Sequence, residues 1–78
     1  MRIRERRLIV AFYTTHDAMA FEDFCLDRGI DGRLIPLPRE ISAGCGLAWS
    51  APPEDVAGMR ALLKEAGIEA QHIKELEI

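Results

Sequence analysis

The sequence predicts an α+β fold with the element order βαββαβ, in which a four-stranded antiparallel sheet carries two helices on one face. Three observations lead to this prediction: an unbroken apolar run at residues 8–12, two segments with apolar residues at helical spacing, and proline or charge in the other strand-like segments. A chain of 78 residues, 49% of them apolar, forms one globular domain. We therefore expect residues 1–78 to form a single domain with a charged N-terminal arm at residues 1–6.

The first predicted strand is Leu8–Phe12. Its residues are all apolar and β-branched in the middle, which is typical of a strand that is buried on both faces and therefore central in a sheet. A helix is predicted to follow, because Thr14 or Thr15 can cap it and apolar residues then recur at helical spacing. Gly29 is expected to end this helix.

The next two strands are separated by an unusually long loop. Arg33–Pro36 is short and ends in proline, which indicates an edge strand. Leu47–Ser50 is the third predicted strand. The loop between them, residues 37–46, runs to about ten residues, whereas most hairpin loops have 2–5. A loop of this length calls for an explanation in structure or function.

The second predicted helix starts at Pro53, with Glu54 and Asp55 at the positive end of its dipole. Gly67 is expected to end it, and the charged segment 69–78 is expected to form a last edge strand. Its apolar stripe consists of Val56, Met59, Leu62, Leu63 and Ala66. Two right-handed βαβ crossovers joined in this order give the ferredoxin-like sandwich, with the first and third strands central.

This topology predicts the surroundings of Cys45. The first strand leads to the start of the first helix, and the second strand, parallel to it, ends at the same edge of the sheet. The loop at residues 37–46 therefore lies beside the N-terminus of the first helix. We expect Cys45, near the end of this loop, to lie close to Thr14, Thr15 and His16.

Cys45 is the residue that we expect to carry chemistry. A helix N-terminus stabilises a nearby thiolate, and Arg39 and His16 can add positive charge. Gly44 and Gly46 permit unusual backbone angles and close approach by a second sulfur or a partner. A cysteine between two glycines has no packing from its neighbours in the sequence, which favours a functional thiol over an inert loop cysteine.

Cys25 is interpreted differently. It lies on the apolar stripe of the first helix with Ala18 and Phe21, roughly 15 Å from the helix start at 1.5 Å per residue. Cysteines joined by a disulfide have Cα atoms within about 7 Å, so we expect no bond between Cys25 and Cys45. Cys25 is therefore predicted to be a core residue.

Composition and charge narrow the class of protein. The net charge is −3, which gives no overall attraction to nucleic acid, although the N-terminal arm is basic. No apolar run approaches the roughly 18 residues of a membrane helix, and no secretory signal is recognisable. Two cysteines and two histidines complete no metal-ligand spacing. We therefore expect a cytoplasmic protein that binds no nucleic acid, membrane, metal or cofactor.

Three stretches together resemble the selenium/sulfur carrier protein-like family of small bacterial proteins: Phe12–Ala18, Gly32–Ser42 and Gly44–Leu47. The resemblance covers nearly the whole chain, and its most distinctive part is Pro-x-Pro-Arg-Glu-Ile-Ser followed by Cys-Gly. It implies that Cys45 carries sulfur or selenium as a persulfide or perselenide. It also implies donor and acceptor proteins as partners.

The residues that match the family pattern surround Cys45 in the loop and in the turn that faces it. They are Pro36, Pro38, Arg39, Ser42, Thr15 and His16. Two residues depart from the pattern. Gly44 stands where family members often have a serine or another small residue, and Cys25 stands where they usually have an aliphatic one.

A second hypothesis is a non-catalytic interaction or regulatory module, in which the proline-rich loop is a docking surface and Cys45 is incidental. An ordinary thiol pKa of about 8.5, with alkylation no faster than that of a free peptide cysteine, would favour this hypothesis over the carrier. A thiol redox sensor is less favoured, because no resolving cysteine lies within reach of Cys45. The sequence leaves open whether two copies associate through a sheet edge.

Overall fold

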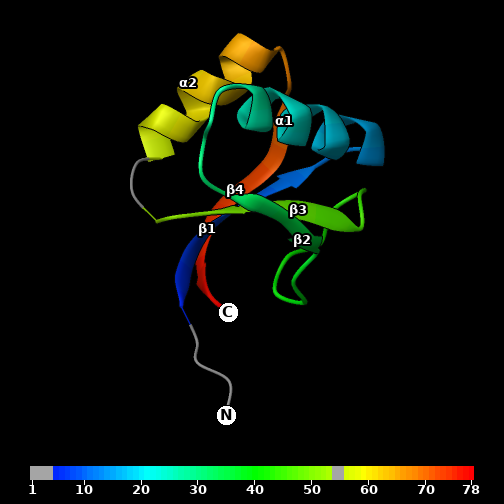
Figure 1. The fold of residues 1–78 in the computed structure, drawn as a ribbon. Coiled ribbons are helices and arrows are strands. Elements are labelled where there is room, and N and C mark those ends of the chain that lie inside the picture. The colour runs from blue at the N-terminus through cyan, green and yellow to red at the C-terminus, as the bar shows by residue number, and fades with distance from the viewer. Residues whose placement is uncertain (1–4, 54–55) are drawn as a thin grey trace.

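The computed structural model describes residues 5–53 and 56–78, and it has the predicted element order (Figure 1). The elements are β1 (Arg6–Phe12), α1 (Thr15–Asp27), β2 (Arg33–Pro36), β3 (Leu47–Ala51), α2 (Val56–Ala66) and β4 (Ala70–Glu77). The strands form one antiparallel sheet in the order β2-β3-β1-β4. The ferredoxin-like prediction is confirmed, including the central places of β1 and β3.

Two predicted boundaries differ from the structure or fall outside it. β1 begins at Arg6, inside the predicted N-terminal arm, because Glu5 exchanges two backbone hydrogen bonds with Ile78, both 2.9 Å long. The pairing with β4 therefore extends the first strand. α2 begins at Val56, so the predicted start at Pro53 is wrong; Glu54 and Asp55, which are predicted in the first turn, lie outside the described residues. Within the described parts of the chain, no helix is long and apolar enough to cross a membrane.

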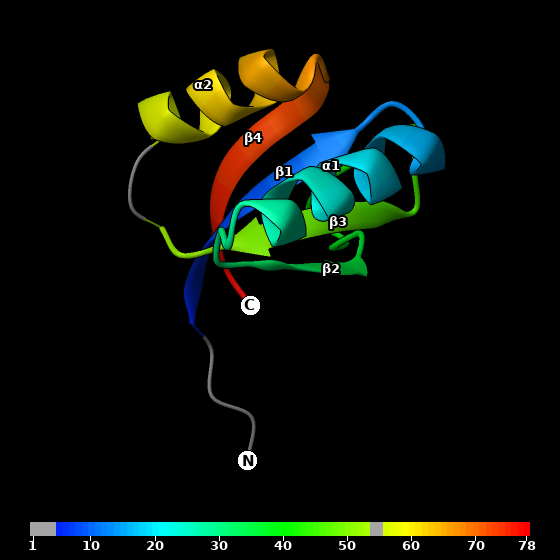
Figure 2. The ribbon, with the colours of Figure 1, turned by 45° about the horizontal axis from the view of Figure 1, so that its top comes forward.

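β1 is buried on both faces, as its apolar run predicts. Leu8, Val10 and Phe12 point toward the helices and join the larger core cluster. Ile9 and Ala11 point the opposite way, and both are completely buried. Both helices lie on one side of the sheet (Figures 1 and 2), so a different segment has to cover the second face.

The loop at residues 37–46 covers that second face. Ile41, only 6% exposed, forms a small apolar cluster with Ile9, Ala11 and Ala48. Leu37 and Ala43 from the same loop pack against this cluster. Figure 1 shows the loop below the sheet and the helices above it. The length of the loop is thus explained by the apolar surface that it buries.

The helices end as the sequence predicts. Thr14 caps α1, because its hydroxyl accepts the Asp17 N–H at 3.1 Å. Gly29 has φ +66° and follows the C-cap, where the left-handed conformation favours glycine. Gly67 follows the last residue of α2 and also has a left-handed conformation, with φ +72°. Of the predicted α2 stripe, Val56 is 42% exposed, because α2 first contacts the core at Met59.

Trp49 on β3 is the largest fully buried side chain, and it packs edge-on against Phe21 with ring centroids 5.7 Å apart. Gly32, at the start of β2, lies directly on the indole ring. Its φ of +147° also lies in the range that glycine alone adopts easily. The turn before β2 therefore depends on the missing side chain of Gly32.

We predict that Gly32→Ala destabilises the fold by about 3 kcal/mol. A Cβ at this position would lie 2.5 Å from Trp49 Cζ2, and the backbone angle would be strained. Urea denaturation followed by tryptophan fluorescence measures the effect. Gly46→Ala is the control, since its Cβ would meet no atom within 4 Å and should change stability by less than about 1 kcal/mol. Equal stabilities of the two variants would contradict this account.

Candidate functional site: a thiol between a loop and a helix start

Cys45 lies where the covering loop returns to the sheet, two residues before β3 begins. Its thiol donates a hydrogen bond to Thr15 Oγ1 at 3.6 Å and accepts the Leu47 N–H at 3.3 Å. Thr15 is the first residue of α1, so the loop and the helix start meet as the topology predicts. A hydroxyl both donates and accepts, so the same threonine can donate to Cys45 after the thiol loses its proton.

The side chain of Cys45 is buried. The residue is only 2% exposed, and it belongs to the same core cluster as Phe12, Ala18 and Phe21. The expectation that its glycine neighbours leave it without packing is therefore wrong. The packing comes from β1 and α1, which are distant in the sequence and close in the fold.

The two flanking glycines have different roles. A Cβ on Gly44 would lie 2.6 Å from the carbonyl oxygen of Tyr13, so this glycine lets the loop approach the turn between β1 and α1. Gly46 faces open space, since a Cβ added to it would have no atom within 4 Å. Neither residue has a positive φ, so close approach rather than an unusual backbone angle explains Gly44.

Two residues at the start of β4 hold the loop, and no pattern in the sequence points to them. Gln71 Oε1 accepts the N–H of Gly44 at 2.9 Å, and His72 Nε2 lies 2.9 Å from the carbonyl oxygen of Ser42. We call these two hydrogen bonds the loop tether. The pairing of His72 with Ala11 brings this end of β4 beside the loop, and no local sequence signal reveals that register.

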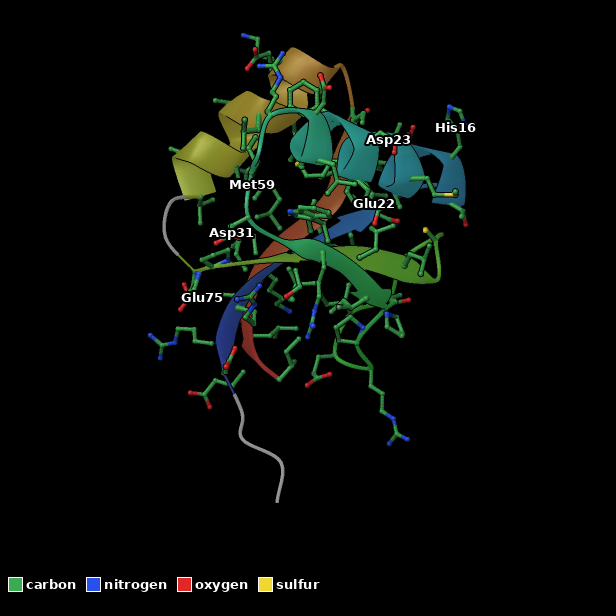
Figure 3. The ribbon with its side chains drawn as sticks, viewed as in Figure 1. His16, Glu22, Asp23, Asp31, Met59 and Glu75 are labelled. Carbon is green, nitrogen blue, oxygen red and sulfur yellow. The ribbon has the colours of Figure 1, made fainter. Side chains whose placement is uncertain are left out.

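The other predicted site residues are distributed more widely. Ser42 contributes its backbone carbonyl to the loop tether. His16 is exposed on α1 and points away from the sheet (Figure 3). Arg39 is exposed and lines a groove of about 1300 Å³ along β2, whose lining does not include Cys45. Of the predicted side chains, the structure thus brings only that of Thr15 into hydrogen-bond contact with the thiol.

Cys25 occupies a contrasting environment. It is completely buried in the core, as predicted, and both cysteines are free thiols. Burial raises the pKa of the Cys25 thiol from 9.0 to about 11. Cys25 is therefore protonated and unreactive at neutral pH.

No group of three His, Cys, Asp or Glu side chains within residues 5–53 and 56–78 could hold a metal ion.

The fold and site define a small ferredoxin-like protein with one thiol enclosed between a loop and a helix start. The model of the family described as Putative Se/S carrier protein-like matches residues 7–75, and the chain belongs to this family. Comparisons with curated proteins and with solved structures found no match.

We predict that Gly44→Ala exposes Cys45. The added Cβ would collide with the carbonyl oxygen of Tyr13 and push the loop away from the start of α1. Alkylation of Cys45 in the native protein should then accelerate by about tenfold or more, since the buried thiol reacts only when its loop opens. Mass spectrometry of iodoacetamide-treated protein measures the rate. Gly46→Ala should alkylate like the wild type, and an unchanged rate in Gly44→Ala would contradict the prediction.

The raised pKa of the Cys25 thiol predicts that the free energy of unfolding depends on pH. Its folded-state pKa of about 11 lies above the ordinary value of 9.0, so the unfolded chain ionises first as the pH rises. The stabilisation is therefore complete below pH 9 and is lost as the pH rises through 11. We expect the wild type to lose about 1–2 kcal/mol more than Cys25→Val over this range in urea denaturation. Parallel pH profiles of the two proteins would show that Cys25 makes no such contribution.

Proposed function

We propose that this protein carries sulfur or selenium from a donor protein to an acceptor protein, bound to Cys45 as a persulfide or perselenide. One observation carries the proposal beyond family membership: the Cys45 sulfur lies between the Leu47 N–H and the Thr15 hydroxyl. Two such donors can stabilise an anionic sulfur at this position. Cys25 has no part in the transfer, because burial keeps it protonated.

The proposed transfer is an exchange of one sulfur atom with no net oxidation. The Cys45 thiolate attacks the outer sulfur of a donor persulfide, and the donor leaves as a thiolate. The new S–S bond on Cys45 replaces the one broken in the donor. A thiolate of the acceptor then attacks the outer sulfur and releases Cys45 as a thiolate. A donor perselenide delivers selenium by the same displacement.

Burial of Cys45 requires the loop to open before transfer. The loop tether consists of two hydrogen bonds to side chains of β4, and both bonds are exposed to solvent. Exposed hydrogen bonds contribute little stability, so a partner can break them at small cost. In the closed loop, α1 and β1 would then shelter the carried atom from other thiols.

Both cysteines are free thiols. Free thiols persist in a reducing compartment, which supports a cytoplasmic location.

One observation favours the second hypothesis, an interaction module in which Cys45 only packs. The residue is 2% exposed, as expected of a small apolar core residue. The Thr15 hydroxyl separates the two hypotheses. A packing cysteine does not need this hydroxyl, whereas a sulfur anion is stabilised by it.

The carrier proposal predicts that Cys45 alone acquires an extra sulfur atom. Intact-mass spectrometry after incubation with a persulfide donor should show one added sulfur in the wild type and in Cys25→Val, and none in Cys45→Ser. Thr15→Val should load about tenfold more slowly, because one donor to the sulfur anion is lost. No adduct on the wild type, or the same adduct on Cys45→Ser, would refute the carrier function.

A further inference from the structure

Exposed apolar side chains gather around α1. Four large hydrophobic residues are exposed in the described chain, and three of them lie at Tyr13, Met19 and Leu26, with exposed fractions of 48%, 54% and 64%. The fourth is Val56, on α2. Met19 and Leu26 lie on α1, and Tyr13 lies in the turn that precedes it. Exposed apolar side chains that lie together on one surface mark a place that a partner can cover.

The two exposed apolar residues of α1 belong to a line of side chains along the outside of the helix. His16, Met19, Asp23 and Leu26 follow one another at spacings of three and four residues, so they share one helix face; we call them the outer stripe. All four are exposed, and Figure 3 shows His16 and Asp23 pointing away from the sheet. Met19 lies one helical turn beyond Thr15, the residue that contacts the Cys45 sulfur. The outer stripe therefore starts at the proposed transfer site.

The charge of α1 is one-sided. The helix contains four carboxylates and neither lysine nor arginine; the carboxylates are Asp17, Glu22, Asp23 and Asp27. Arg28, which follows the helix, is engaged elsewhere: it pairs with Glu65 and lies over the Phe24 ring. Among the described residues, no cation forms an ion pair with a carboxylate of α1.

Two of these carboxylates oppose the stability of the helix itself. Asp23 and Asp27 are four residues apart, which brings like charges onto adjacent turns. Asp27 also lies in the last turn, where the helix dipole is negative and no basic residue is present to offset it. Helix stability therefore does not account for this pattern. A cationic partner would make the electrostatic energy of these carboxylates favourable.

We propose that the outer stripe is the docking surface for the protein that loads Cys45, and that this donor presents basic residues around an apolar groove. The two apolar residues of the stripe, Met19 and Leu26, are seven residues apart, which is one of the spacings at which apolar anchors of a helix enter a groove. Acidic side chains beside them would steer a basic surface toward the site. The proposal rests on the carrier function, since it assigns the donor side of that transfer.

The same charges argue against other occupants. A second copy of the chain would bring one acidic α1 against another, which opposes association through this face. Nucleic acid and anionic membranes would be repelled in the same way. Donor proteins with a basic surface are the class of partner that the stripe fits.

Two variants with matched controls test the docking surface. The first is Met19→Gln with Leu26→Gln, and its control is Val56→Gln, which changes the exposed apolar residue of α2. The second is Asp23→Asn with Asp27→Asn, and its control is Glu69→Gln, an exposed carboxylate outside α1. The hydrogen bonds of the Cys45 sulfur are with Thr15 and Leu47, and neither residue is substituted.

Each protein is loaded by two donors, a purified cysteine desulfurase supplied with cysteine and the small molecule glutathione persulfide. We expect both stripe variants to load about tenfold more slowly from the desulfurase, and both controls to load like the wild type. Raised salt should slow loading of the wild type and have less effect on the asparagine variant. The asparagine variant should also melt at a higher temperature, so that stability and loading change in opposite directions.

The small donor separates failure of docking from failure of the carrier function. Glutathione persulfide needs no protein surface, so it should load the wild type and all variants at equal rates. Equal loading of stripe variants and wild type by the desulfurase would overturn the docking proposal, as would loading by glutathione persulfide alone. If neither donor modifies Cys45, the carrier function fails and the docking proposal fails with it.

Discussion

The burial of β1 on both faces is the constraint on which the rest of this structure depends. The helices cover one face, where Val10 is completely buried, and the second face needs a cover from elsewhere in the chain. The loop at residues 37–46 supplies it through Ile41. A loop that crosses beneath the sheet must return to it beside the start of α1. That return places the Cys45 sulfur against Thr15, so the candidate site follows from the packing of a central strand.

Two thiols in one small core show how the surroundings decide reactivity. Cys25 lies on α1 among apolar side chains, and burial alone raises its pKa to about 11. Cys45 is nearly as buried, yet a backbone N–H and a hydroxyl reach its sulfur. Burial penalises an anion, and hydrogen-bond donors offset that penalty. This contrast supports assigning the proposed transfer to Cys45 and a packing role to Cys25.

The charge pattern on the outer face of α1 departs from the pattern that stabilises a helix. Local rules for helices favour acidic residues in the first turn and basic residues in the last, and α1 follows the first rule with Asp17 and breaks the second with Asp27. Functional surfaces are where such rules are expected to fail, because selection for binding acts against selection for stability. The break occurs on the helix that also contacts the candidate thiol, which links the two features in one proposal.

The sequence by itself determined the element order, the central place of β1, both helix ends at Gly29 and Gly67, and the meeting of Cys45 with the start of α1. These depend on local periodicity, turn chemistry and a handedness rule, all of which act over short stretches of chain. Only the tertiary structure decided that Cys45 is buried, that Gly44 serves close approach, and that β4 tethers the loop. Burial and strand register arise from contacts between distant segments, so no local pattern encodes them.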